Sequence, residues 1–126
     1  MELISKPGVN PIWVFAIDGI RAYLDDRDGE PDPAQLAAAE FVANDLSETR
    51  RKASDYLDVF VDRRHASKRV DEPWWFEEMD FRASENSPSA YSLHFTLDGD
   101  GDGLWTVEMR LTGATHRPFR FERLQG

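Results

Sequence analysis

Three aspartates at alternate positions have the spacing in this sequence that is closest to a metal site. Asp98, Asp100 and Asp102, with glycine at the sixth place, match the opening of an EF-hand calcium loop. The twelfth place should hold a glutamate but holds Met109, and residues 105–111 alternate as a strand instead of forming the exiting helix. The sequence therefore favours a polar turn over a calcium site, and we expect no metal or cofactor.

Serines, histidines and carboxylates form no recognisable catalytic motif in this sequence. The histidines, His65, His94 and His116, are not spaced as paired metal ligands on a helix. Neither a Gly-x-Ser-x-Gly nucleophile elbow nor a glycine-rich phosphate loop occurs. Glu77 and Glu78 are adjacent, and adjacent residues of a strand point to opposite faces, so we do not expect them to pair as acid and base. The sequence predicts a protein without enzymatic activity.

Three aromatic residues in succession, Trp74, Trp75 and Phe76, stand out from the rest of the chain. If they form a strand, at least one ring must lie on its outer face. An exposed ring with an acidic rim is typical of a protein-binding hot spot. The alternative is that helix and sheet cover both faces and bury all three rings. On the first interpretation, the partner-binding residues are Trp74, Phe76, Glu77, Glu78 and Asp80, with Asp98, Asp100 and Asp102 at the rim.

The net charge of −9 argues against a nucleic-acid-binding protein, which needs a basic surface to neutralise phosphates. It favours a basic partner, and acidity that only keeps a protein in solution is an equally good interpretation. A chain of 126 residues, 40% of them hydrophobic, suits a single domain over residues 1–126. Without cysteines, a recognisable signal peptide or a long apolar run, we expect a cytoplasmic protein that does not bind membranes.

Apolar residues that alternate with polar ones predict strands in the C-terminal half. These strands would span residues 74–81, 91–97, 105–111 and 119–123. Near the N-terminus, Asp18 and Gly19 lie between two apolar runs, which is a strong signal for a β-hairpin. The alternative there is that Asp18 caps a short helix over residues 19–26.

Between the two groups of strands, the sequence predicts one long helix from Pro33 to Arg64, or two collinear helices with a kink near Ser47. Asp32 followed by proline is a typical helix start. Apolar residues then recur every three or four positions as far as Phe60, which indicates a helix that covers a sheet. The expected fold is α+β, with one long helix packed on an antiparallel β-meander of four or more strands and an N-terminal β-hairpin.

A series of short motifs characterises residues 74–124. Tyr91-x-Leu-x-Phe is followed by the Asp/Gly turn, by Leu104-Trp-x-Val and by Arg-Pro-Phe-x-Phe-x-Arg, which ends at Arg123. This order is similar to the sheet pattern of small acidic immunity proteins of bacterial polymorphic toxin systems. The resemblance implies a non-enzymatic inhibitor that binds a cognate toxin, often a basic nuclease, and blocks its active site. The alternative function is a regulatory or adaptor domain that forms a homodimer and has no catalytic activity.

Overall fold

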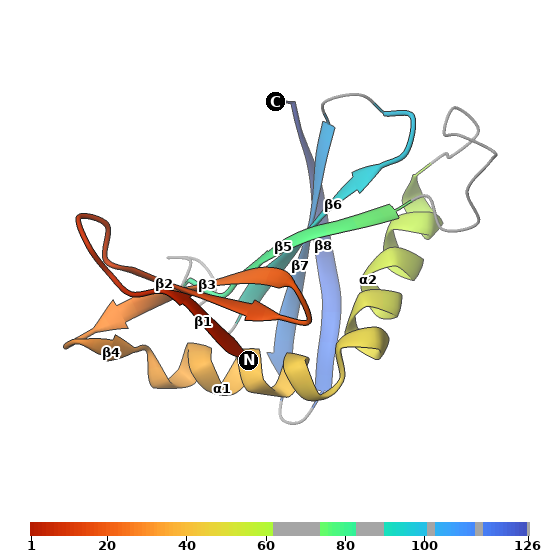
Figure 1. Cartoon of the computed structure of the whole chain (residues 1–126). Helices are drawn as coiled ribbons and strands as arrows, with labels where there is room; N and C mark the ends of the chain where they lie inside the picture. Colours follow the sequence, from red (N-terminus) through yellow and green to blue (C-terminus); the bar gives the residue numbers. More distant parts are fainter. Residues whose placement is uncertain (62–73, 83–89, 101–102, 113–114, 126) are drawn as a thin grey trace.

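The computed structural model describes residues 1–61, 74–82, 90–100, 103–112 and 115–125, and within them it has an eight-stranded sheet and two short helices (Figure 1). The elements in chain order are β1 (Glu2–Ser5), β2 (Ile12–Ile17), β3 (Ile20–Arg27), β4 (Glu30–Pro31), α1 (Pro33–Asn44), α2 (Leu46–Phe60), β5 (Trp74–Asp80), β6 (Ala90–Leu97), β7 (Gly103–Thr112) and β8 (Thr115–Gln125).

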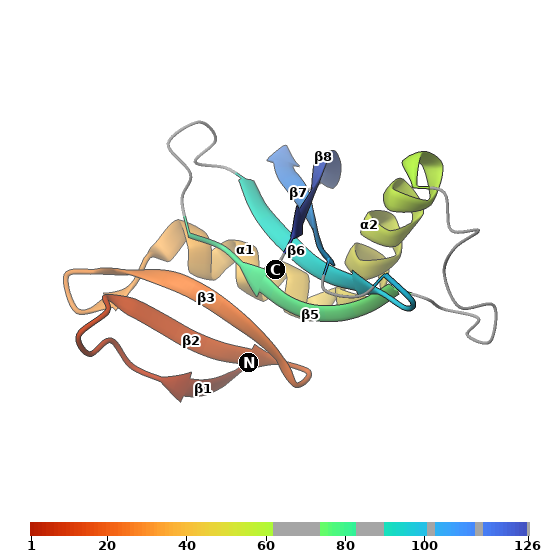
Figure 2. The same cartoon turned by 90° about the horizontal axis from the view of Figure 1, so that it is seen from above.

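The sheet is mixed, because its two halves join through a parallel pair of strands. The strand order is β1-β2-β3-β5-β6-β7-β8, with β4 pairing on β3. The pairing of β3 with β5 is parallel, and the other pairings are antiparallel. A parallel pair needs a crossover connection, and the chain between β3 and β5 supplies one that contains both helices. β5 is thereby the central strand, with the N-terminal and C-terminal strands on opposite sides of it (Figure 2).

The N-terminal hairpin turns at Asp18 and Gly19, as predicted. β2 and β3 pair in antiparallel register, with Ile17 opposite Ile20. Asp18 and Gly19 have φ angles of 51° and 82°. These left-handed values are what a two-residue hairpin turn requires, and aspartate and glycine tolerate them better than most residues. The alternative of a helix over residues 19–26 is therefore excluded.

The predicted fold is wrong: in place of one long helix on an antiparallel sheet, the structure has two short helices and a mixed eight-stranded sheet, in which β5 to β8 form the antiparallel meander. The helical segment divides at Asp45, whose φ of −141° and ψ of 41° are not helical, and α1 and α2 run in different directions (Figure 1). Each helix buries its own apolar residues, Val42 in α1 and Leu57 in α2, so the apolar spacing continues although the axis turns. Neither described helix is long and apolar enough to cross a membrane. α2 ends at Phe60, and Arg64 lies outside the described residues.

One side of the sheet packs against the helices and forms the core, and the opposite side is left uncovered by them. Along β6, alternate residues are buried and the residues between them are half-buried. The buried residues of β6 share one cluster with buried residues of α1 and α2. Neither described helix covers the side chains that point the other way from the central strands, and this side of the sheet is called the uncovered face below.

The core contains the buried imidazole of His116 on β8. Its Nδ1 lies 2.6 Å from the hydroxyl oxygen of Tyr91, and the Phe41 ring of α1 stacks on it with 3.9 Å between centroids. The other nitrogen, Nε2, has no hydrogen-bond partner among the described residues. Burial, and after it the charge of Lys52, lower the pKa of His116 below the usual value. The folded protein therefore favours the neutral imidazole.

We expect the free energy of unfolding to decrease as the pH falls below about 6.5, the ordinary pKa of histidine. Below that pH the unfolded chain binds a proton at His116 more readily than the folded chain does, which favours unfolding. Above it, His116 is neutral in both states and this destabilisation is absent. His116→Phe, which keeps an aromatic ring in the core, should flatten this dependence. Urea denaturation of both proteins at about pH 8 and about pH 5.5 tests it, and an equal pH dependence of the two would contradict it.

Candidate partner-binding face of the sheet

β5 contains an extra residue, and this β-bulge decides which side chains reach the uncovered face. The register between β5 and β6 shifts between Phe76 and Glu78. Glu77 accepts a hydrogen bond from the Thr96 hydroxyl at 2.7 Å. Glu78 Oε1 lies 3.0 Å from His94 Nδ1. Since His94 and Thr96 are two residues apart on one face of β6, both carboxylates lie on that face, and the expectation that they point to opposite faces is wrong.

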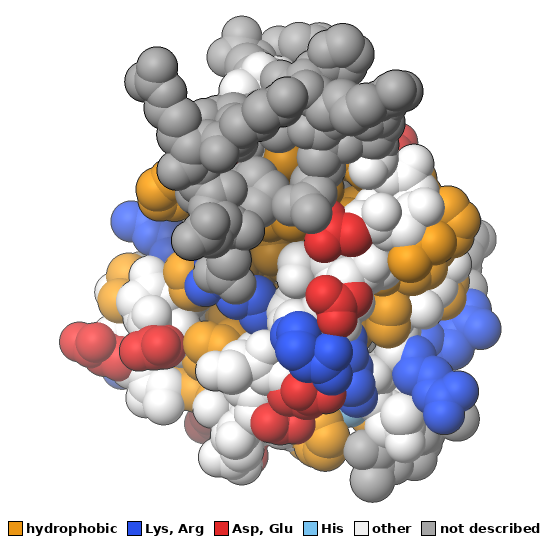
Figure 3. Space-filling model, turned by 90° about the vertical axis from the view of Figure 1, so that its right-hand side faces the viewer, with side chains coloured by type: hydrophobic (Ala, Val, Ile, Leu, Met, Phe, Trp, Pro, Cys, Tyr) orange, Lys and Arg blue, Asp and Glu red, His pale blue; other side chains and the backbone are white. Residues whose placement is uncertain are grey.

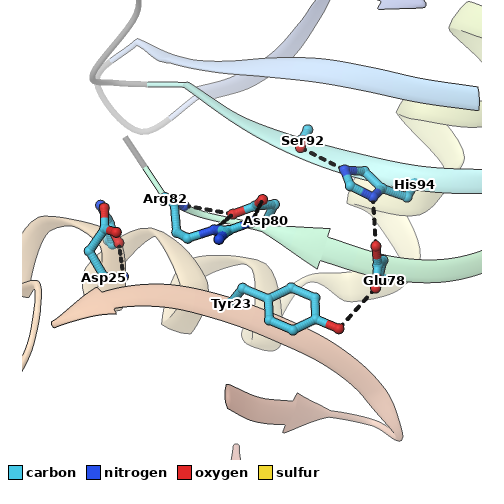
Figure 4. A network of polar contacts seen from close by, with 8 residues as sticks. Tyr23, Asp25, Glu78, Asp80, Arg82, Ser92 and His94 are labelled. Carbon is cyan, nitrogen blue, oxygen red and sulfur yellow. Dashed lines mark hydrogen bonds and ion pairs between the residues drawn. The ribbon is translucent and has the colours of Figure 1, made fainter. Parts of the chain in front are cut away.

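A chain of hydrogen bonds crosses the uncovered face from β3 to β6 (Figure 4). The Tyr23 hydroxyl donates to Glu78 Oε2 at 3.0 Å. The other carboxylate oxygen lies 3.0 Å from His94 Nδ1. His94 Nε2 lies 2.9 Å from the Ser92 hydroxyl oxygen. We call these four side chains the polar chain; they come from three strands and meet because β3 pairs with β5 and β5 with β6.

The directions of these bonds follow from the carboxylate. An ionised Glu78 can only accept, so Tyr23 donates to one of its oxygens and the Nδ1–H of His94 to the other. In the tautomer that carries the proton on Nδ1, Nε2 is the acceptor for the Ser92 hydroxyl. Burial first, and then the hydrogen bond and charge of Glu78, raise the pKa of Tyr23. Tyr23 is therefore held as a neutral donor.

The remaining acidic side chains near the polar chain have partners of their own. Arg82 donates to both carboxylate oxygens of Asp80, at 2.9 and 2.7 Å. Asp25 accepts from the side-chain amide of Gln35 in α1 at 2.8 Å. Of the three acidic residues of β5 predicted to contact a partner, Asp80 is thus in an ion pair with Arg82, whereas Glu77 bonds to Thr96 and Glu78 to Tyr23 and His94.

Trp75 brings the exposed aromatic ring to the uncovered face, and Trp74 and Phe76 belong to the core. Trp75 is 55% exposed, whereas the other two rings are buried. The Trp74 indole N–H donates to Asp58 of α2 at 2.8 Å. Phe76 stacks on Phe95 with 5.1 Å between ring centroids. Trp74 and Phe76, which the sequence suggested as contact residues, are therefore engaged inside the fold, and the ring accessible to a partner is Trp75.

The acidic turn between β6 and β7 lies at the same end of the sheet as Trp75, which pairs with Thr96 just before the turn begins at Asp98. The Oδ2 atom of Asp100 accepts from the Trp105 indole N–H at 2.8 Å and from Nε of Arg123 at 3.0 Å. The hydrogen bond from Arg123 is the main cause that lowers the pKa of Asp100. Asp100 therefore stabilises the hairpin, and Asp98 remains a candidate contact residue.

The turn does not continue as an EF-hand would. It leads into strand β7, whereas a calcium loop of that type leads into a helix. In the part of the chain that the structure describes, no group of three histidine or acidic side chains is placed to hold a metal ion. Asp102 and His65, both considered as candidate ligands from the sequence, lie outside the described residues.

The polar chain has the order of groups of a nucleophile, a base and an acid. The Ser92 hydroxyl faces one imidazole nitrogen, and a carboxylate faces the other. β6 is paired on both sides, with β5 and with β7, so its backbone N–H groups are used in the ladder and do not form an oxyanion hole beside Ser92. The arrangement is thus suited to holding side chains rigidly and to proton transfer, and the described backbone of β6 supplies no oxyanion donors to it.

The sequence did not reveal the polar chain, because its members come from three strands. Ser92 and His94, two residues apart in a predicted strand, were recognisable as sharing a face. Glu78 and Tyr23 join them only through the strand order and the bulge. The sequence did not mark the bulge, because Trp75, Met79 and Phe81 share odd positions and read as one uninterrupted alternation. Only the burial of Trp74 and Phe76 together with Met79 and Phe81 shows that the parity changes.

Glu78→Gln should lower the pKa of Tyr23 only part of the way to the ordinary value of a tyrosine. The amide removes the negative charge that opposes ionisation of the phenol, and burial, the larger cause of the raised pKa, remains. Ultraviolet absorbance titration of tyrosinate, with Tyr23→Phe subtracted, measures this pKa. An identical Tyr23 titration in the wild type and in Glu78→Gln would show that the two side chains do not interact in solution.

Similarity to other proteins adds no assignment to these side chains. Comparison with protein-family models, with curated proteins and with solved structures finds no match. The function of the uncovered face has to be argued from its own chemistry, which consists of an exposed indole, two carboxylates on one side of a bulge and a polar chain that ends at a serine hydroxyl.

Proposed function

We propose that this protein binds a basic protein partner through the uncovered face and neutralises it in the cytoplasm, as a toxin-immunity protein does. One observation carries the proposal: the indole of Trp75 is 55% exposed on β5, which is the central strand of the sheet. Tryptophan is the side chain most enriched among the residues that dominate binding energy, and such residues cluster at the centre of an interface.

The energetics of an exposed indole favour a partner. Covering the exposed half of a tryptophan removes roughly 100 Å² of largely apolar surface from water, which stabilises a complex by about 2 kcal/mol. The neighbouring side chains are already held, since Glu77 bonds to Thr96 and Glu78 bonds to Tyr23 and His94. Binding therefore has to order few rotamers, which lowers the entropic cost of association.

The charge of the chain indicates the chemistry of the partner. The net charge of −9 attracts a basic protein over long range. Glu77 and Glu78 supply negative charge next to Trp75, while Asp80 and Asp100 are paired with arginines. On the side of the molecule that α2 presents, positive and negative side chains are intermixed (Figure 3). Only two carboxylates therefore supply negative charge beside Trp75, and the net charge of the whole chain supplies most of the long-range attraction of a basic partner.

The resemblance of residues 74–124 to small acidic immunity proteins suggests which basic protein is bound. An inhibitor that covers the active site of a toxin needs a rigid surface of matching charge and no reaction of its own. A sheet face whose side chains bond to one another is such a surface. A homodimeric adaptor, the alternative, would place a second copy of the chain over Trp75, and the mass of the protein in solution separates the two.

Trp75→Ala should weaken binding of the cognate toxin domain by about 30-fold, roughly 2 kcal/mol. Phe60→Ala is the matched control, because Phe60 is 58% exposed but lies on α2, on the covered side of the sheet. Isothermal titration calorimetry with the purified toxin domain measures both affinities, and Phe60→Ala should bind like the wild type.

The other outcomes of this titration are equally informative. A loss of affinity in Phe60→Ala but not in Trp75→Ala would place the interface on the α2 side and overturn the proposed face. A wild-type protein that does not bind the toxin domain would overturn the toxin-neutralising role. A dimeric mass that Trp75→Ala reduces to that of a monomer would favour the homodimeric adaptor instead.

Glu77→Lys should lower the association rate constant with the toxin domain several-fold at low salt, and the difference from wild type should shrink at high salt. Glu40→Lys makes the same change in net charge at an exposed position on α1 and should have a smaller effect. Stopped-flow measurements that use the tryptophan fluorescence of the protein give both rate constants. Equal effects of the two substitutions would mean that only net charge matters and that Glu77 is not at the interface.

A further inference from the structure

The polar chain ends at a serine hydroxyl that binding to a partner does not require. Ser92 Oγ lies 2.9 Å from His94 Nε2, and His94 Nδ1 lies 3.0 Å from Glu78 Oε1. We propose that Ser92 is a nucleophile, activated by His94, that accepts an acyl group from an aryl ester. This inference goes beyond partner binding and does not rest on it.

The geometry supports a proton path from Ser92 to His94. The imidazole presents Nε2 to the hydroxyl and Nδ1 to the carboxylate, which is the arrangement that lets a histidine act as a general base. Glu78 is itself oriented, because its second oxygen accepts from Tyr23 at 3.0 Å. The His94 side chain is 15% exposed, so part of the imidazole meets solvent while its hydrogen bonds hold it in place.

The charges on either side of Ser92 are compensated. In the register of the sheet, Ser92 lies opposite Asp80 on β5 and Glu108 on β7. Asp80 is bonded to Arg82, and Glu108 is paired with Arg120. A hydroxyl between two bare carboxylates would resist becoming negatively charged, whereas here each carboxylate has an arginine beside it. The two carboxylates therefore add little net negative charge beside Ser92.

The reaction is a transfer of one acyl group. The Ser92 oxygen forms a bond to the carbonyl carbon while its proton passes to His94 Nε2. The bond from that carbon to the aryl oxygen then breaks, and the imidazolium returns the proton to the departing phenol. Aryl esters are the expected donors because their leaving group is a weak base and needs little assistance, and the strand amides near Ser92 supply no oxyanion hole. Because no strand amide stabilises the oxyanion that forms when water attacks the ester, the acyl-serine should be hydrolysed slowly and persist.

The proposal is tested with p-nitrophenyl acetate and the full chain. The wild type should release a burst of about one equivalent of nitrophenol, and the intact mass should increase by one acetyl group, which peptide mapping locates on Ser92. Ser92→Ala should abolish the burst, while Ser47→Ala, a control at an exposed position of α2, should retain it. His94→Gln should lower the acylation rate about 100-fold.

Glu78 is tested as a positioning residue. Glu78→Gln should lower the acylation rate about 10-fold, and Glu78→Asp should restore part of it, a pattern that a general loss of structure would not give. A wild type without a burst above that of Ser92→Ala, or an acetyl group found only on other residues, would overturn the proposal. If His94→Gln does not fold by circular dichroism, the burst in Ser92→Ala and the rate in Glu78→Gln still decide it.

Discussion

The β-bulge at Glu77 is the constraint on which the rest of this structure depends. The central strand has to bury Trp74 and Phe76 at its start, Met79 one residue before its end and Phe81 one residue after it. The two pairs differ in parity, so an uninterrupted strand would turn one of them to solvent. Each such side chain contributes about 1.5 to 3 kcal/mol when buried. One inserted residue lets both pairs face the helices.

The same bulge shapes the uncovered face. Because Glu77 is the inserted residue, it and Glu78 share one face, on which Trp75 also lies. The parallel pairing of β3 with β5 then brings Tyr23 to the carboxylate of Glu78. A face built in this way differs from a random polar surface, since its side chains are fixed by one another and do not have to be ordered when something binds.

The two proposals use different parts of this face and share Glu78, which supplies charge in one and orients His94 in the other. Partner binding depends on the indole of Trp75 and on negative charge, and both would act on a basic protein without any covalent step. Acyl transfer depends on Ser92 and His94, which lie nearer the start of β6, where they pair with Asp80 and Glu78 of β5. Each can be true without the other, because a substitution at Trp75 leaves the hydrogen bonds of the polar chain in place and a substitution at Ser92 leaves the indole exposed.

Local signals in the sequence predicted the local structure well. The alternation along β6 and β7, the Asp18-Gly19 turn and the helix start at Asp32 depend only on neighbouring residues, and the Asp32 side chain does cap α1. The acidic turn was also predicted as a turn. The identity of the exposed ring was not predicted correctly, because that depends on where a strand is interrupted.

The sequence alone determined which segments alternate, where the chain turns and that its charge is strongly negative. Tertiary structure decided that the helix divides at Asp45, that β3 and β5 pair in parallel, and that Tyr23, Glu78, His94 and Ser92 meet. The physical reason is that these features minimise the exposed apolar surface of the whole sheet and helices together, a quantity that no short window of residues contains.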